Sequence, residues 1–259
     1  MTTAGIVAEY NPFHTGHAYQ ISQTRQQLGE DTAVVVVMSG CWVQQAGCAV
    51  ADKWTRARLA LMGGADLVLE LPTVWATASA ESFARGAVSL LHATGVVTHL
   101  SFGSEHGDTA GLERVARCLD TPEYRDALAV HLKQGMSFPA ARQRGVEDLL
   151  GTEGTLLATP NNNLGIEYIR SLNALNSPIR PVTVLRKGAA HNTIVDDTPE
   201  FLSATQIRRD LKAGDWSHAA PYLLPGSREV LEGSASGLPG LDVAERAILA
   251  RLRTMTAAD

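Results

Sequence analysis

The sequence has few cysteines, since its 259 residues include only Cys41, Cys48 and Cys118. Their odd number and their spacing fit neither a disulfide framework nor a zinc site, so we expect reduced thiols and no structural metal. Long apolar runs are also missing. The longest, Ala33 to Met38, is far shorter than the roughly 20 residues of a transmembrane helix, and the N-terminus lacks the features of a signal peptide. These absences predict a cytoplasmic protein without a membrane anchor.

An excess of positive charge is missing as well. The formal net charge is -5, which argues against a protein whose whole surface binds nucleic acid, although a local basic patch stays open. The 45% of hydrophobic residues argue against disorder and supply a sizeable core.

Short apolar segments alternate with amphipathic ones along the chain. This alternation predicts a Rossmann-like α/β fold, in which five parallel strands are joined by crossover helices that cover both faces of the sheet. The expected strands are Ala4 to Glu9, Ala33 to Met38, Asp66 to Leu71, Val96 to Phe102 and Arg180 to Leu185. The expected helices are Thr15 to Leu28, Asp52 to Met62, Ser79 to Ala93, Thr109 to Leu119, Pro122 to Lys133, Phe138 to Leu150, Leu164 to Leu175, Ser203 to Lys212 and Leu241 to Arg253.

The same pattern divides the chain into two parts. We expect one large domain over residues 1–232, with an inserted helical pair at about residues 121–150. Residues 233–259 are expected to form a linker, rich in Gly and Ser, and the start of a C-terminal helical segment.

The first turn from strand to helix carries a candidate phosphate site. His14 and His17 are three residues apart, so their rings face the same way on one helical turn, and Gly16 leaves open backbone between them. The helix start offers free N–H groups and a positive dipole end to a phosphate. Two imidazoles there can stabilise a phosphate whose charge grows in a transition state. The alternative is two histidines that only cap a helix, but the position at this turn favours the phosphate site.

A second candidate phosphate site lies near the end of the large domain, in the segment Ser203-Ala-Thr-Gln-Ile-Arg208. Hydroxyl groups at a helix start and a guanidinium group together can hold the β and γ phosphates of a nucleoside triphosphate. On its own, this pattern fits equally well a serine that only caps a helix and an arginine at the protein surface. Together with H-x-G-H after the first strand, it resembles the nucleotidylyltransferase superfamily.

Several further motifs narrow the resemblance to one family, and they cover essentially the whole chain. They are Gly5-Ile-Val-Ala-Glu-Tyr-Asn-Pro-Phe-His-Thr-Gly-His17, Met38-Ser-Gly40, Asp52-Lys-Trp-Thr-Arg-Ala57, Gly64-Ala-Asp-Leu-Val-Leu-Glu-Leu-Pro72, Phe102-Gly-Ser-Glu105, Pro160-Asn-Asn-Asn-Leu-Gly165 and Arg186-Lys187. In these motifs the sequence resembles the tRNA(Met) cytidine acetate ligase family. The resemblance implies activation of acetate by ATP to acetyl-adenylate, with release of pyrophosphate. The acetyl group would then pass to the wobble cytidine of elongator tRNA(Met), giving N4-acetylcytidine.

The resemblance also implies the residues of the site. His14 and His17 would be catalytic. The ATP-binding residues would be Val7, Ala8, Glu9, Tyr10, Asn11, Pro12, Phe13, His14, Thr15, Gly16, His17, Ala18, Tyr19, Gln20, Gly103, Asn162, Arg186, Lys187, Ser203, Thr205 and Arg208. Gly103 would let the nucleotide lie against bare backbone, and the choice between Asn161 and Asn162 stays open.

Two further sets of residues bear on the substrates. Lys53 and Arg56 share one face of a helix start and are candidate substrate contacts, a basic rim whose alternative is an ordinary solvated helix face. Gln45 stands where members of the resembled family usually have an arginine. If that arginine binds phosphate or tRNA, this sequence lacks one such contact. The sequence carries no metal-binding motif, so we expect that any Mg²⁺ arrives with ATP.

The expected partners are thus ATP, acetate and elongator tRNA(Met). Family members are longer than this chain, so we expect either a truncated form or a natural short variant, and weak binding of tRNA by the residues present. The main alternative function is that of another adenylyltransferase, which makes a dinucleotide from a phosphorylated small molecule. A nucleotide-binding regulatory module without turnover is a third, which the intact phosphate motifs disfavour.

Overall fold

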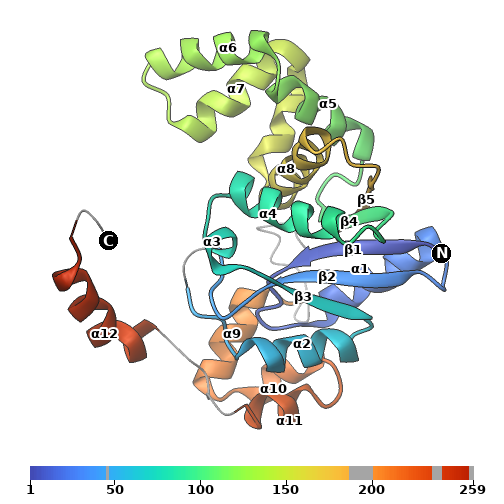
Figure 1. Cartoon of the computed structure of the whole chain (residues 1–259), viewed down its shortest axis with the longest axis vertical. Coiled ribbons are helices and arrows are strands. Elements are labelled where there is room, and N and C mark those ends of the chain that lie inside the picture. The colour runs from blue at the N-terminus through green and yellow to red at the C-terminus, as the bar shows by residue number, and fades with distance from the viewer. Residues whose placement is uncertain (45–46, 187–200, 235–240, 257–259) are drawn as a thin grey trace.

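The structure is a computed structural model that describes residues 1–44, 47–186, 201–234 and 241–256. Its centre is a sheet of five strands that all run parallel (Figure 1). The strands are β1 (Thr3–Ala8), β2 (Ala33–Ser39), β3 (Leu67–Leu71), β4 (His99–Ser104) and β5 (Arg180–Leu185). The predicted five-stranded parallel sheet is therefore confirmed, with boundaries that differ by a few residues.

The order of the strands creates a place for a ligand. The order is β3-β2-β1-β4-β5, so the chain moves from β1 outward to β2 and β3 and then crosses back to β4 and β5. The direction of winding reverses between β1 and β4. Open parallel sheets bind ligands at such a reversal, outside the carboxyl ends of the strands. The turn that contains His14 follows β1 directly, so the reversal lies where the sequence predicts it.

Most helices also lie at their predicted positions. They are α1 (Thr15–Leu28), α2 (Lys53–Met62), α4 (Ala80–Ala93), α5 (Thr109–Leu119), α6 (Pro122–Lys133), α7 (Phe138–Leu150), α8 (Pro160–Ala174), α9 (Ala204–Ala213) and α12 (Leu241–Thr254). The sequence did not predict the short helices α3 (Thr73–Ala76), α10 (Trp216–Ala219) and α11 (Ser227–Glu232), nor the 3-10 helices η1 (Gly151–Ala158) and η2 (Ala220–Tyr222).

Two predicted boundaries near the ligand crevice were wrong. The helix predicted to begin at Leu164 begins at Pro160, so that Pro160 to Asn163 form the first turn of α8. Proline is well suited to the first position of a helix, because its missing N–H would have no partner there. The strand predicted to end at Phe102 continues over Gly103 and Ser104, which pair with β5.

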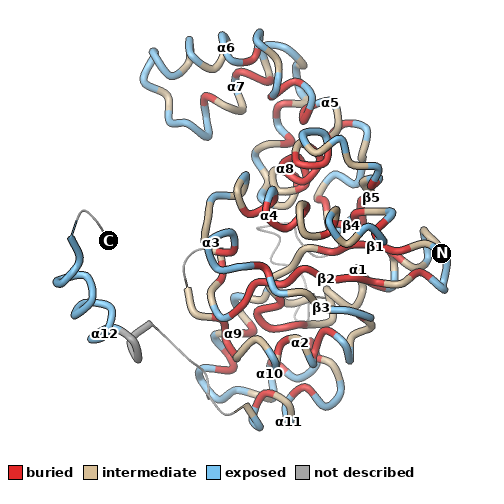
Figure 2. Tube along the Cα trace, viewed as in Figure 1, coloured by how far each residue is buried: buried red, intermediate tan, exposed pale blue. Residues whose placement is uncertain are grey.

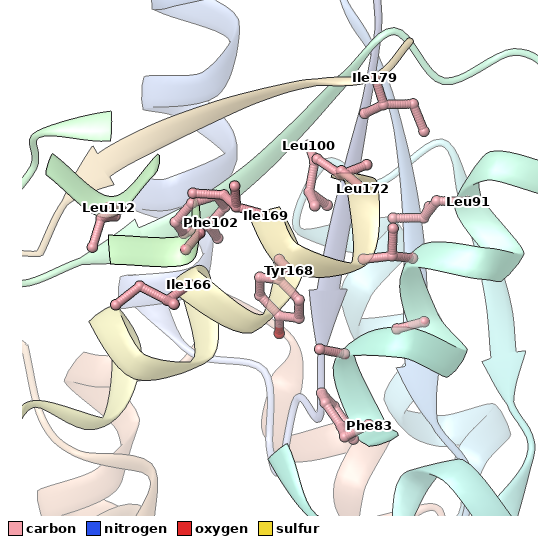
Figure 3. Packing of buried hydrophobic residues seen from close by; sticks show 14 of the residues in the cluster. Phe83, Leu91, Leu100, Phe102, Leu112, Ile166, Tyr168, Ile169, Leu172 and Ile179 are labelled. Atoms are coloured by element: carbon pink, nitrogen blue, oxygen red, sulfur yellow. The ribbon is translucent and has the colours of Figure 1, made fainter. Parts of the chain in front are cut away.

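Helices cover both faces of the sheet and form two cores. On one face α4, α5 and α8 pack against the strands, with Leu91, Phe102 and Ile166 among the buried side chains (Figure 3). On the other face α1, α2 and α9 contribute Leu59 and Ile207 to a second cluster of buried side chains. The central strands are correspondingly buried along most of their length (Figure 2). This arrangement confirms helices on both faces.

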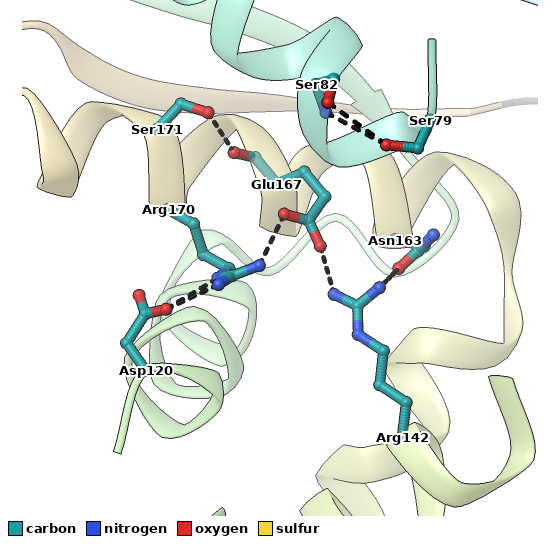
Figure 4. Close-up of polar contacts among 8 residues, drawn as sticks. All are labelled: Ser79, Ser82, Asp120, Arg142, Asn163, Glu167, Arg170 and Ser171. Carbon is teal, nitrogen blue, oxygen red and sulfur yellow. Dashed lines mark hydrogen bonds and ion pairs between the residues drawn. The ribbon is translucent and has the colours of Figure 1, made fainter. Parts of the chain in front are cut away.

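The helical pair α6 and α7 is tied to α8 by a network of charged side chains (Figure 4). Glu167 of α8 is 2% exposed and forms ion pairs with Arg142 of α7 and with Arg170. Arg142 also donates to Asn163 Oδ1 over 3.0 Å, and Arg170 pairs with Asp120 over 2.7 Å. A buried carboxylate keeps its charge only when it is paired and hydrogen-bonded. Arg142 therefore fixes α7 to α8, and Arg170 joins α8 to Asp120 at the end of α5.

The last described helix, α12, exposes apolar side chains: Ile248, Leu249 and Leu252 are 37–58% exposed. None of the helices in the described part of the chain combines the length and the apolar composition that crossing a bilayer requires. The division of the chain into residues 1–232 and 233–259 remains a prediction.

Candidate active site

A cavity of about 220 Å³ lies at the carboxyl ends of β1, β4 and β5. Its walls come from the ends of these strands and from α1, α8 and α9. The lining residues are Val7, Ala8, Glu9, Tyr10, Asn11, His17, Gln20, Phe102, Gly103, Asn161, Leu164, Tyr168, Arg186, Ala204 and Arg208. Glu9 supplies the only carboxylate among these described residues, whereas Arg186 and Arg208 supply positive charge.

His14 and His17 hold each other in place at the start of α1. His14 Nδ1 accepts a hydrogen bond from the Gly16 N–H over 3.1 Å, and His17 Nδ1 accepts one from the His14 N–H over 3.2 Å. The ring centroids are 3.8 Å apart. A neutral imidazole whose Nδ1 accepts must carry its proton on Nε2. Each ring therefore keeps an Nε2–H donor, for which the described residues offer no acceptor.

Both histidines are neutral in the folded chain. Burial, with the charge of Arg186 in addition, lowers the pKa of His14 to about 4. Burial lowers the pKa of His17 well below its usual value too, and the neighbouring His14 and Arg186 act in the same direction. The burial of His17 comes partly from Tyr10 and Phe13, whose ring centroids lie 4.8 and 5.4 Å from that of His17. The pair therefore offers hydrogen bonds rather than charge at neutral pH.

Gly16 leaves room for a neighbouring ring. A Cβ at this position would lie 2.9 Å from His14 Cε1 and 3.0 Å from His14 Nδ1. Both distances are too short for a side chain. The open backbone thus makes room for the ring of His14 itself, and approach of a ligand to Gly16 remains a prediction.

The second phosphate motif meets the first one at the cavity. Ser203 caps α9, and its Oγ accepts from the Gln206 N–H over 3.2 Å. Arg208 donates to the carbonyl oxygen of Asn11 over 2.9 Å and to Thr205 Oγ1 over 3.1 Å. Two segments far apart in the sequence therefore place His17 and Arg208 on the walls of one cavity.

Gly103 makes room for a neighbouring side chain as well. A Cβ at Gly103 would lie 3.1 Å from Arg186 Cγ, so the side chain of Arg186 runs over this glycine. Both residues line the cavity. Arg186 therefore occupies part of the space over Gly103, and contact of this backbone with the nucleotide remains a prediction. Lys187, predicted beside it, lies outside the described residues.

Burial distinguishes the two neighbouring asparagines. Asn162 is 3% exposed, and its Oδ1 accepts from Ser104 Oγ over 2.6 Å and from the Glu105 N–H over 3.0 Å. Asn161, and not Asn162, lines the cavity. The amide oxygen of Asn162 is thus committed to the loop that follows β4, and a contact of Asn162 with the nucleotide remains a prediction.

The basic rim predicted at the start of α2 was wrong. Arg56 is fully buried and donates to main-chain carbonyl oxygens of Glu9, Ser39, Gly40 and Ala51. It therefore holds the ends of β1 and β2 together instead of facing a substrate. Lys53 Nζ pairs with Glu70 over 2.5 Å. Gln45 lies outside the described residues.

Several predicted ATP-binding residues do not line the cavity, and others line it that the sequence did not single out. The described residues without a place on its walls are Pro12, Phe13, His14, Thr15, Gly16, Ala18, Tyr19, Asn162, Ser203 and Thr205. The additional wall residues are Phe102, Leu164, Tyr168 and Ala204. Phe102 belongs to a quoted motif, but Tyr168 gives no signal beyond its position in an amphipathic helix. The roles of all these residues remain predictions.

The cavity holds groups suited to an anionic ligand. The described residues contain no group of three or more His, Cys, Asp or Glu side chains that could hold a metal ion. Arg186, Arg208 and the neutral imidazole of His17 on the cavity walls, with His14 beside His17 at the start of α1, instead provide donors for phosphate oxygens.

Known proteins resemble the chain over most of its length. The tRNA(Met) cytidine acetate ligase of Syntrophomonas wolfei is 41% identical over 99% of this chain and 63% of its own length. That of Thermoanaerobacter sp. is 40% identical over 90% of this chain and 59% of its own. The chain thus spans about three fifths of these curated relatives.

Two solved structures of one protein are similar to this chain in both fold and sequence. Thermotoga maritima TmcAL in its apo form has a TM-score of 0.89 and 39% identity over 99% of this chain and 63% of its own. The same protein bound with α-thio ATP has a TM-score of 0.82 and 41% identity, over 90% of this chain and 55% of its own. The family model described as HIGH Nucleotidyl Transferase matches residues 1–258. The chain therefore belongs to the HIGH nucleotidyltransferase family.

Proposed function

We propose that the chain binds ATP in this cavity and activates acetate to acetyl-adenylate. The observation that carries the proposal is the neutral His17, whose Nε2–H donor is left over on a cavity wall shared with Arg186 and Arg208, and whose ring centroid lies 3.8 Å from that of His14, a second neutral donor. The names of the relatives and the ATP analogue in a solved neighbour support it. Since the chain spans only part of those proteins, their acetate ligase activity is part of the proposal.

In the first step an oxygen of acetate attacks the α-phosphorus of ATP. The bond between this phosphorus and the bridging oxygen to the β-phosphorus breaks, and pyrophosphate leaves. Negative charge grows on the phosphate oxygens as this happens, and Nε2–H donors that are already oriented stabilise it without a cost of rearrangement. Arg208 beside Thr205 and Ser203 is suited to the β and γ phosphates. We propose that Mg²⁺ accompanies ATP as part of the substrate.

In the second step the exocyclic amine of the wobble cytidine in elongator tRNA(Met) attacks the acetyl carbonyl carbon. The bond to the adenylate oxygen breaks, AMP leaves, and the amine gives up one proton, which yields N4-acetylcytidine. A cytoplasmic location, where tRNA is available, belongs to the same proposal.

The test is release of pyrophosphate from ATP with different second substrates. We expect acetate to stimulate release, and small phosphorylated acceptors to have no effect. Stimulation by a phosphorylated acceptor instead would favour an adenylyltransferase that makes a dinucleotide. Nucleotide binding without any release would favour a regulatory module.

A further inference from the structure

One carboxylate joins the loop after β4 to the first turn of α8. Glu105 Oε1 accepts from the main-chain N–H of Asn161 over 3.2 Å and from Asn161 Nδ2 over 2.5 Å. Its Oε2 accepts from the N–H of Asn162 over 2.9 Å. Burial alone would raise the pKa of Glu105, but these hydrogen bonds lower it below its usual value. The side chain is therefore an ionised carboxylate, which accepts hydrogen bonds and donates none.

This carboxylate fixes the direction of the Asn161 amide. An amide group has one end that donates and one that accepts. Because Glu105 only accepts, the end of Asn161 that faces it must be Nδ2, and a flipped amide would place oxygen against oxygen. Asn161 lines the cavity, and no described residue donates to its Oδ1. The polar atom that Asn161 has left for a ligand is thus an acceptor.

We infer that Glu105 is a positioning residue which presents Asn161 Oδ1 to the nucleoside of the bound nucleotide. This wall of the site then selects a hydrogen-bond donor on the ligand, which is either the 6-amino group of adenine or a ribose hydroxyl. The inference rests on the proposed function, because it takes the cavity to be the ATP site. A purine with a 6-oxo group would bring an acceptor against an acceptor.

The test is calorimetric binding of nucleotides to the whole chain. The ligands are ATP, purine riboside triphosphate, which lacks the 6-amino group, and 2′-deoxy-ATP and 3′-deoxy-ATP, which each lack one hydroxyl. Loss of one neutral hydrogen bond corresponds to about 2-fold to 12-fold in affinity. We expect the unaltered chain to bind one of the three analogues more weakly than ATP by such a factor, and that analogue identifies the donor.

The variants Glu105→Gln and Asn161→Ala should both remove the preference for ATP over that analogue. A glutamine amide can pair with either end of Asn161, so the direction of the amide is no longer fixed. The double variant should show no larger loss of preference than either single one. Glu153→Gln, which alters an exposed ion pair with Arg114 outside the cavity, is the matched control and should keep the preference. If Glu105→Gln fails to fold, Asn161→Ala still tests the contact.

Two results would overturn the inference while ATP still binds. One is equal affinity of the unaltered chain for ATP and all three analogues. The other is weaker binding of all four nucleotides to Glu105→Gln by the same factor, since a purely structural role of Glu105 would act in this way. If no nucleotide binds to the unaltered chain, the proposed function fails, and the inference fails with it.

Discussion

The proposed role of the two histidines as uncharged donors sets their expected sensitivity to mutation. An oriented donor to a growing negative charge typically contributes roughly 10²–10³ in rate. His17→Ala should therefore lower acetate-dependent exchange of pyrophosphate into ATP by about this factor, with the fold intact. His92→Ala is the control, because His92 bonds Ser177 away from the cavity. Exchange by His17→Ala within a few fold of the unaltered chain would refute the role.

The same burial makes the stability of the chain depend on pH. The pKa of His14 is lowered to about 4 in the folded chain from a usual value of 6.5, which applies to the unfolded chain. Between these values the unfolded chain binds more protons, so the free energy of unfolding falls as the pH falls from 6.5 towards 4. Urea unfolding at several pH values should show this decrease, and His14→Gln should reduce it. Equal pH dependence of both proteins would contradict the assigned burial.

Residue types and spacing singled out two phosphate motifs, because each motif follows from where a strand ends or a helix begins. The structure brings His17 and Arg208 of these motifs to one cavity. Residue types and spacing gave no sign that Arg56 and Asn162 are buried. Whether a polar side chain faces a ligand or a carbonyl group depends on loops that come together only in the folded chain. Arg56 binds carbonyl groups from three separate segments, and no local pattern contains that information.

Among the structural elements, the long helices were predictable and the short ones were not. Capping residues such as Asp52 and Ser203 and a periodic apolar face mark a helix of ten or more residues. A helix of four residues, such as α3 or α10, is too short to show a period. The helix α8 begins earlier than predicted because the carboxylate of Glu105, distant in sequence, satisfies its first N–H groups.

The attachment of the inserted helices to α8 should be a major source of stability. Leaving a buried charge without any partner typically costs about 3–5 kcal/mol, and less where a second partner such as Arg170 remains, whereas an exposed pair contributes little. Arg142→Ala removes a partner of the buried Glu167, and Arg144→Ala, on the same helix, removes an exposed pair with Glu147. We expect the free energy of unfolding in urea to fall far more in Arg142→Ala. Similar losses in both variants would show that the buried network does not hold the helices.

For the whole molecule, the alternation of strands and helices was enough to predict the parallel sheet. It also located the ligand crevice, since parallel strands end on one side and the winding reverses beside β1. The contact of α9 with the turn after β1 was implied only by the resemblance of the two phosphate motifs to one superfamily. No rule of spacing places Arg208 against the carbonyl group of Asn11.

The charges of the whole chain predict weak binding of tRNA. The net charge is -5, Arg56 is buried, and Arg186 and Arg208 line the cavity. Affinity for RNA depends on neutralised phosphates, with a salt slope of about 0.7 per contact for single strands. Filter binding of elongator tRNA(Met) over a range of salt should therefore give low affinity and a shallow slope. Tight binding with a steep slope would show a tRNA surface that this distribution of charge does not reveal.

The central claim is that acetate attacks the α-phosphorus of ATP in this cavity, and an oxygen isotope tests it directly. The chain is incubated with MgATP and acetate labelled with ¹⁸O in both oxygens, and hydroxylamine takes the acetyl group from the adenylate. Mass spectrometry then measures the AMP formed. The account predicts one ¹⁸O atom in each AMP, because the attacking oxygen stays on phosphorus when the carbonyl carbon is attacked. AMP without ¹⁸O, or AMP formed equally well without acetate, would contradict it.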